Sequence, residues 1–459
     1  MSTDTTALYP TMAAALQHDS RIETARRLIR EAHAEYREQL DAPRPGKLSY
    51  DDLLGDFAAL RGAPLFYRYL GSGLGNGALV ELADGSVKYD FISGIGVHGW
   101  GHGSDLLLEA GLDAALGDTV MQGNLQQNPV SVDVSRLLLE LTQPSRLAHV
   151  LLTTSGAMAN ENALKIAFQA RAPANRVIGF EGNFCGRSLA LAQVSDKPQY
   201  RDGLPQTLAV DYIPFYDAND PCGSTEHACA ALEHVLARYP GQHAVFMAEL
   251  IQGEGGYYPA PREFFVRLFE RCRAANVLIH VDEIQTFGRT EEAFAFRHVD
   301  LAEYVDLVSV GKITQICATL FTDAISPRPG LVSQTFTGST HALHAARAIL
   351  TELSKPGVRV RGLSCCQALR EHLVTLAVEH PDLATGPFGY GGMVAFTPYG
   401  GERDRVLDLA RRLFDAGVIA FVCGASPMRL RFLPPIGVVS LHDVDAVAAI
   451  LTRCLEEGA

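Results

Sequence analysis

The spacing of apolar and polar positions changes twice along the chain. Residues 20–40 repeat apolar positions at helical spacing among many charges, which predicts a surface helix. The glycine-dense stretch 71–77 predicts a loop, and Asp84-Gly85 favours a hairpin turn after it. From about residue 149 short apolar runs alternate with amphipathic stretches, and from about residue 340 long helical patterns dominate.

The middle region has the pattern of an α/β, doubly wound domain. Its short apolar runs predict strands of a parallel sheet, because strands covered by helices on both faces are apolar throughout. Helix-like segments such as 159–170 and 261–275 separate them. The runs cover residues 149–153, 176–180, 208–213, 244–250, 277–281 and 305–310.

The last third of the chain predicts a second, smaller α+β unit. Its helix-like stretches are longer and its strand candidates fewer than in the middle region. The helical stretches are 342–353, 404–416 and 441–457, and the strand candidates are 392–396 and 429–432.

Length, charge and cysteine usage narrow the class of protein. The 459 residues exceed the roughly 250–300 at which one hydrophobic core stops growing, so at least two packed units are expected. The 39 basic and 52 acidic residues give a formal charge of −13, which disfavours a nucleic-acid partner. No export signal or apolar run of membrane-spanning length is visible, so we expect no membrane partner. Nine cysteines without C-x-x-C spacing favour reduced thiols in the cytoplasm over disulfides or a metal site.

The residues that directly follow the apolar runs are the first candidates for chemistry, because open α/β sheets bind ligands beyond the carboxyl ends of their strands. Ser155-Gly156-Ala157 leads from a strand into a helix, an arrangement that binds anions. Asp282 and Lys312 follow two other strands. A phosphate site, an acid and an amine together suggest pyridoxal phosphate (PLP), which needs a lysine and an acid partner for its ring nitrogen.

Lysine is scarce in this chain, so few residues can be the lysine that binds the cofactor. Of its six lysines, only Lys312 directly follows an apolar strand. An amine at a buried strand end is costly unless it has a function.

Several motifs then resemble, in the right order, the class III or omega-type aminotransferases of PLP fold type I. The similarity runs from about Asp84 to Pro435, most of the chain. The segment Gly311 to Gln315 most resembles the lysine 6-aminotransferase and 4-aminobutyrate aminotransferase branches. The matching stretches are Thr154 to Glu161, Phe184 to Ser188, Gln252 to Gly256, Val281 to Thr286 and Gly311-Lys312.

The resemblance implies roles around the cofactor ring. Lys312 would bind the cofactor covalently and, once released, carry the proton between substrate carbon and cofactor. Asp282 would pair with the pyridine nitrogen. Gln285 would hydrogen-bond the ring oxygen, and Phe184 would stack on the ring.

It also implies where the phosphate lies and how the chain is organised. Gly156 and Ala157 would donate backbone N–H groups to the phosphate. Thr335 matches the threonine that reaches the phosphate of the neighbouring subunit, which implies a homodimer with shared active sites. We therefore expect residues 76–340 to form the large PLP-binding domain and 341–459 the small domain. Residues 1–75 would join the small domain or a dimer contact.

Two arginines and one glutamate would recognise the substrates, since a guanidinium binds carboxylates bidentately. Arg187 matches the residue that holds the carboxylate far from the reacting amine. Arg431 matches the one that binds the α-carboxylate of glutamate. Glu254 would cover Arg431 while an ω-amine is bound, so that one pocket serves two substrates.

The expected activity is the transfer of an amino group, from an ω-amine donor such as lysine, ornithine or 4-aminobutyrate, to a 2-oxo acid such as 2-oxoglutarate. Another PLP reaction, such as that of an aminomutase, racemase or decarboxylase, is the alternative, because fold does not determine chemistry. A binding protein on a retained scaffold is a third possibility. The chain departs from the family pattern at Cys185, Leu250, Ser339 and Thr340, which border the pocket and bear on substrate choice.

Two other patterns carry less weight. Gly94-x-Gly96-x-x-Gly99 fits the dinucleotide fingerprint, but Trp100-Gly101 follows where a helix is required. His98 and His102 are four residues apart among glycines, so they share no helical face and predict no metal site.

Overall fold

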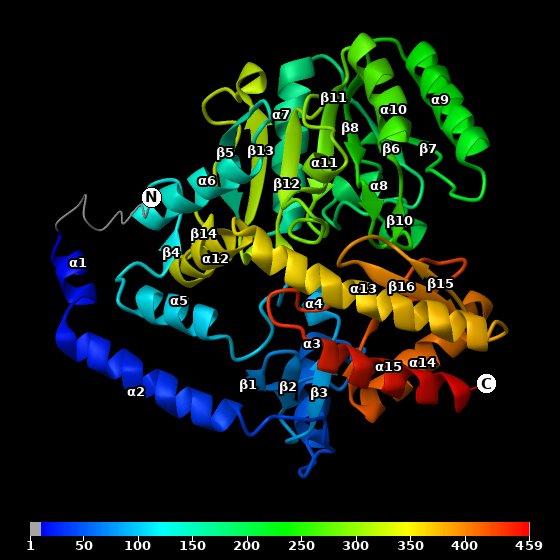
Figure 1. Ribbon diagram of the computed structural model, residues 1–459. Coiled ribbons are helices and arrows are strands. Elements are labelled where there is room, and N and C mark those ends of the chain that lie inside the picture. The colour runs from blue at the N-terminus through cyan, green and yellow to red at the C-terminus, as the bar shows by residue number, and fades with distance from the viewer. Residues whose placement is uncertain (1–10, 459) are drawn as a thin grey trace.

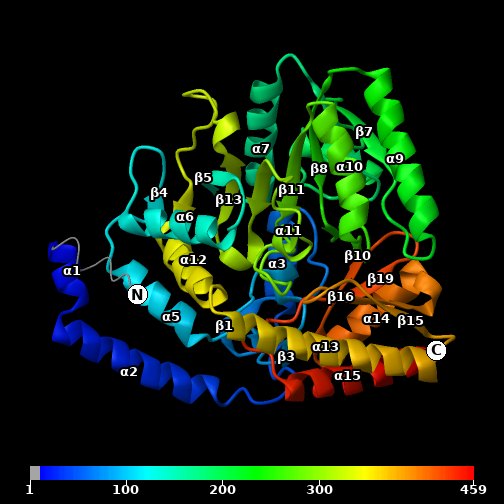
Figure 2. The same cartoon turned by 45° about the horizontal axis from the view of Figure 1, so that its top comes forward.

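The computed structural model describes residues 11–458. One large sheet with helices on both sides occupies the upper half of the view in Figure 1, and smaller sheets lie below it. The long helix α13 (Pro356–Glu379) crosses between the two halves, as the turned view in Figure 2 also shows.

The large sheet has seven strands in the order β5-β13-β12-β11-β8-β6-β7. All six predicted strands are confirmed. The sheet is mixed rather than purely parallel, because β13 runs antiparallel to both β5 and β12. The strands are β5 (Leu147–Thr153), β6 (Arg176–Phe180), β7 (Ala209–Ile213), β8 (His243–Ala248), β11 (Leu278–Glu283), β12 (Leu307–Val310) and β13 (Cys317–Thr322).

Both faces of this sheet are buried, which explains why its strands are apolar throughout. Along β8, Phe246 and Ala248 pack into the cluster that includes helices α9 (Pro221–Arg238) and α10 (Arg262–Ala274). Val245 and Met247 point to the other face and pack with α7 (Gly156–Arg171). Alternate side chains thus fill two separate cores, as expected for a period of two residues.

A second sheet joins the two ends of the chain. The predicted hairpin is confirmed, since β2 (Leu79–Leu82) and β3 (Val87–Asp90) pair antiparallel around Gly85, whose φ is +78°. Strand β17 (Val418–Ile419) pairs parallel with β3. We propose that strands β1 (Gly71–Asn76), β2 and β3 pack as part of the C-terminal unit. The division of the chain into domains at residues 1–75, 76–340 and 341–459 stays a prediction.

The loop predicted for the glycine-dense stretch is wrong, because it forms β1 (Gly71–Asn76), paired with β2. Glycine serves close packing there. A Cβ on Gly75 would lie 2.3 Å from Cβ of His102 and 2.5 Å from the carbonyl oxygen of Leu79.

The small unit contains the sheet β15-β16-β19-β18. Helix α13 was not predicted, whereas the three helical stretches and both strand candidates of this region are confirmed. The elements are α12 (Thr340–Leu353), α14 (Arg403–Ala416), α15 (Leu441–Glu456), β15 (Ala384–Phe388), β16 (Val394–Pro398), β18 (Phe421–Cys423) and β19 (Arg429–Phe432).

The N-terminal helices lie at the edge of the molecule (Figure 1). The predicted surface helix is α2 (Ser20–Arg37), which has no buried residue. Arg26 of α2 forms an ion pair of 2.6 Å with Asp113 of α5 (Asp105–Ala115). The remaining helices are α1 (Met12–Gln17), α3 (Asp51–Arg61), α4 (Ser93–Gly96), α6 (Pro129–Leu141), α8 (Leu191–Val194) and α11 (Ala295–His298). The remaining short strands are β4 (Met121–Gln122), β9 (Ile251–Gln252), β10 (Tyr258–Pro259) and β14 (Gly338–Ser339).

Within the described range, no helix combines the length and apolar character needed to cross a membrane. All nine cysteines are free thiols.

Candidate active site

A cavity at the carboxyl ends of the strands of the large sheet brings together most of the predicted site residues. Its walls come from loops that follow β5, β6, β8, β11 and β12. It is lined by Gly156, Ala157, Asn160, Phe184, Cys185, Gly186, Glu249, Glu254, Asp282, Ile284, Gln285 and Lys312. Seven of the ten predicted site residues therefore line one cavity.

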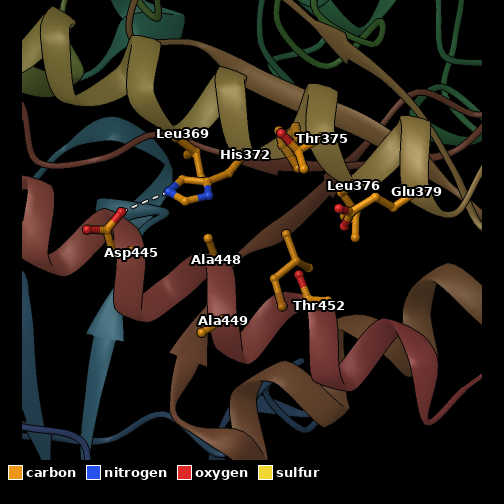
Figure 3. Close-up of a pocket in the computed structure, with 11 residues that line it drawn as sticks. Leu369, His372, Thr375, Leu376, Glu379, Asp445, Ala448, Ala449 and Thr452 are labelled. Carbon is orange, nitrogen blue, oxygen red and sulfur yellow. Dashed lines mark hydrogen bonds and ion pairs between the residues drawn. The ribbon is translucent and has the colours of Figure 1, made fainter.

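A different cavity lies between α13 and α15, where His372 and Asp445 are 2.8 Å apart (Figure 3). None of the predicted site residues lines it. We therefore assign the chemistry to the cavity at the strand ends.

The first turn of α7 faces the cavity at the strand ends. Ser155 caps this helix, and its side chain accepts a hydrogen bond from the backbone N–H of Met158 at 3.2 Å. The N–H groups of Gly156 and Ala157 lie in the first turn, where backbone N–H groups have no acceptor within the helix. Together with the helix dipole they form a site for an anionic group such as phosphate.

Asp282 is a buried carboxylate, only 4 % exposed, near the end of β11. It accepts hydrogen bonds from the N–H of Ile284 at 2.9 Å and from Nδ2 of Asn160 at 2.7 Å. Burial raises the pKa of Asp282. Among residues 11–458 it has no ion-pair partner, so a protonated ring nitrogen fits this position well.

Lys312 begins the segment after β12, and its φ of +55° is unusual for a residue other than glycine. Burial lowers the pKa of the Lys312 amine to about 8, while Glu254 opposes this shift and Arg431 adds to it. An amine with a pKa near 8 is partly neutral at physiological pH. Lys312 can therefore act as a nucleophile and as a proton carrier.

Glu254 and Arg431 form an ion pair at the edge of the cavity, with 2.6 Å between Oε1 and Nη2. The side chain of Arg431 is fully buried and that of Glu254 is 21 % exposed. Burial alone lowers the pKa of Arg431, but Glu254 outweighs this effect and the net shift is upward. Arg431 Nη1 also donates to Oε1 of Gln285 at 3.5 Å. A carboxylate on a substrate can take the place of Glu254 on this guanidinium.

Three predicted residues do not line the cavity, and one of them, Arg431, reaches it through its ion pair with Glu254. Arg187 is exposed, and its guanidinium lies 4.1 Å from the ring centre of Tyr200 and 5.7 Å from that of Phe184. Thr335 is exposed in the segment before β14, close to Gly123. Thr335 is not among the residues that line the cavity of its own chain, and its role in a neighbouring subunit stays a prediction.

Sequence reasoning assigned no role to Asn160, although it lies one helical turn after Gly156 on the same face of α7. Its Nδ2 donates to Asp282 and to the backbone oxygen of Cys185, each at 2.7 Å. Glu249, which directly follows β8 and therefore lies at a strand end like Asp282, was likewise given no role. Both positions could have been recognised from the sequence, Asn160 by its spacing from Gly156 and Glu249 by its place at a strand end.

The glycine fingerprint and the histidine pair of the sequence lie outside this cavity. In the Gly94-x-Gly96-x-x-Gly99 segment, Gly94 and Ile95 have positive φ, and the next helix begins only at Asp105. Nε2 of His102 lies 2.9 Å from Asp90. Within residues 11–458, no group of three or more acidic, histidine or cysteine side chains is placed to hold a metal ion.

Comparison with known proteins identifies the class. Residues 72–455 match the family model described as aminotransferase class-III. The chain is 33% identical to the L-lysine-epsilon aminotransferase of Mycobacterium tuberculosis over 338 residues, which cover 67% of this chain and 73% of that protein. It is 30% identical over 409 residues to acetylornithine aminotransferase 1 of Bradyrhizobium diazoefficiens, covering 85% and 94%.

The structural comparison agrees. The lysine aminotransferase of M. tuberculosis in its internal aldimine form matches with a TM-score of 0.80 and 25% identity, covering 88% of this chain and all of that one. The fold is therefore PLP fold type I. The chain belongs to the class-III aminotransferases, and it is a PLP-dependent enzyme that transfers amino groups.

Proposed function

We propose that this aminotransferase takes the ω-amino group of a lysine-, ornithine- or 4-aminobutyrate-type donor and passes it to a 2-oxo acid such as 2-oxoglutarate. The Glu254–Arg431 ion pair carries the proposal. In one state Glu254 covers Arg431, and in the other Arg431 is free to bind a substrate carboxylate. The relatives named for lysine and acetylornithine support a donor of this type.

We propose that the residues of the cavity hold PLP in the way their chemistry suggests. Gly156 and Ala157 bind the phosphate at the start of α7, and Asp282 pairs with the ring nitrogen. Gln285 hydrogen-bonds the ring oxygen, and Phe184 packs against the ring. When bound, PLP acts as an electron sink that lets the bond between carbon and hydrogen beside the amine break.

Lys312 has two roles in this proposal. Its amine attaches the cofactor covalently, and after release it takes the proton from the substrate carbon and returns it. The same side chain can do both, because its lowered pKa of about 8 leaves an appreciable neutral fraction near physiological pH.

The two states of Arg431 explain how donor and acceptor share one pocket. With Glu254 in place, the positive charge of Arg431 is covered and an uncharged part of an ω-amine donor can lie beside it. When Glu254 turns away, Arg431 binds the α-carboxylate of glutamate or of the 2-oxo acid. Arg187, in the aromatic setting of Tyr200, binds the distal carboxylate.

The working form proposed is a homodimer in the cytoplasm. Thr335 would reach the phosphate of the neighbouring subunit, which fits its exposure outside the cavity of its own chain. Nine free cysteines, eight of them buried, suit a reducing compartment.

A donor screen with purified protein and 2-oxoglutarate tests the proposal. Lysine, ornithine, N-acetylornithine and 4-aminobutyrate should each be tried, with glutamate formation as the readout and Lys312→Ala as the inactive control. At least one ω-amine donor should yield glutamate. Product formed from the amine without any 2-oxo acid would instead indicate an aminomutase, racemase or decarboxylase.

A further inference from the structure

Glu249 is a carboxyl group in the cavity for which the proposed cofactor contacts provide no role. It directly follows β8, is 6 % exposed and lines the cavity with Asp282 and Lys312. A buried carboxyl group near another carboxylate is costly unless its oxygens are hydrogen-bonded.

Both oxygens of Glu249 are hydrogen-bonded, and the donors come from two different loops. Oε2 accepts from the backbone N–H of Phe184 at 2.8 Å, in the loop after β6. Oε1 accepts from the backbone N–H of Gly253 at 3.0 Å, in the turn between β9 and β10 that also carries Glu254. The Glu249 side chain thus connects the loop that carries Phe184 to the turn that carries Glu254.

The turn is restrained on its other sides as well. A Cβ on Gly253 would lie 2.7 Å from Oε1 of Gln285, so the backbone packs directly on that side chain. The carbonyl oxygen of Glu254 accepts from the N–H of Gly424 at 3.1 Å. These contacts hold the turn against Gln285 and Gly424, and the hydrogen bonds of Glu249 link it to the Phe184 loop.

We propose that Glu249 is a positioning residue that couples the Phe184 ring to the Glu254–Arg431 pair. The inference deepens the proposed function and rests on it. Weakening the contacts of Glu249 loosens both loops together. PLP is then held less tightly, and Glu254 leaves Arg431 more readily, which favours glutamate over ω-amine donors.

Glu249→Gln tests this coupling, because its amide NH₂ cannot accept a hydrogen bond from a backbone N–H. The apoenzyme of this variant should bind PLP about tenfold more weakly in an equilibrium titration, the size expected for one lost hydrogen bond. The ratio of kcat/KM for the ω-amine donor to that for glutamate should fall. Hydrogen exchange at the amides of Phe184 and Gly253 should become faster.

Asp211→Asn is the matched control. Asp211 pairs with Arg176 at 2.7 Å and with His243 at 2.8 Å, at the amino ends of β6 and β8 and away from the cavity. This variant should lose stability and leave all three readouts unchanged. If Glu249→Gln behaves like this control, Glu249 is merely structural and the proposal is overturned.

Two further measures keep the test decisive. If Glu249→Gln does not fold, Glu249→Asp keeps the carboxyl group but shortens its reach, and the same three changes are expected. Hydrogen exchange of the apoenzyme requires no turnover. If the wild-type enzyme transfers no amino group, the proposed function fails, while the exchange data still decide whether Glu249 joins the two loops.

Discussion

The carboxylate of Glu254 lies 2.6 Å from the guanidinium of Arg431, and Arg431 is completely buried. Nη2 of Arg431 faces Glu254, while Nε has no hydrogen-bond partner within residues 11–458. A charged group in this state has donors left for a second carboxylate. The pair therefore both stabilises the buried guanidinium and occupies a site that a substrate carboxylate can take.

Glu254→Gln should shift the enzyme toward glutamate. The neutral amide no longer compensates the buried charge, so KM for glutamate should fall and KM for the ω-amine donor should rise, each by about tenfold. Stability should drop by about 1–3 kcal/mol in urea unfolding, because a charged donor loses its ionic partner. Glu226→Gln, which breaks the exposed ion pair with Arg267, should change neither measurement. Unchanged donor preference would contradict the two-state role of Arg431.

Reconstitution of the apoenzyme with PLP should speed up as the pH rises through about 8. The pKa of Lys312 is lowered to about 8, and only the neutral amine can attack the aldehyde. Below this pKa each pH unit reduces the neutral fraction about tenfold. Stopped-flow absorbance between pH 6 and 10 measures the rate. A rate that keeps rising steeply to pH 10 would mean that the amine has an ordinary pKa.

Asp282→Asn should separate stability from function. Burial raises the pKa of Asp282, so removing its charge should not destabilise the apoenzyme in thermal unfolding. Turnover should nevertheless fall by at least about a hundredfold, because the charge that stabilises the protonated ring is lost. Asp306→Asn, a control that breaks a 2.9 Å ion pair with Arg146, should keep its turnover. Near-normal activity of Asp282→Asn would rule out the proposed pairing with the ring nitrogen.

Hybrid dimers should reveal whether the active sites are shared. If Thr335 serves the neighbouring subunit, a dimer of one Lys312→Ala chain and one Thr335→Ala chain contains one fully native site. Mixing the two weakly active variants under dissociating conditions should then restore up to half of the wild-type activity per hybrid dimer. If Thr335 served its own chain, both sites of the hybrid would be damaged and mixing would restore nothing.

The local pattern of the sequence was enough for the large sheet and for much of the site. Strands buried on both faces are apolar throughout, so their ends could be found, and Asp282 and Lys312 were identified as the charged residues that follow them. Helix α7 was predictable for the same reason, and with it the anion site at Gly156. These features depend on residues close together in the chain.

Features that depend on distant contacts were missed. Strand β13 pairs with β5, more than 150 residues earlier, and its antiparallel direction has no local signature. In strand β1, Gly75 leaves room for His102, which packs against it and is 27 residues away in the sequence. The role proposed for Glu249 could not be predicted either, since it depends on two loops that meet only in the folded chain.

The sequence by itself determined the class of enzyme, the position of the strand ends and the identity of the reactive lysine, because periodicity and motif order are local properties. The tertiary structure decided which charges meet. Only the fold brings Arg431 of β19 to Glu254 and buries the guanidinium, and their mutual attraction outweighs burial, so the pKa of Glu254 is lowered and that of Arg431 is raised. Burial is a property of the whole packed chain, so no stretch of the sequence alone could reveal it.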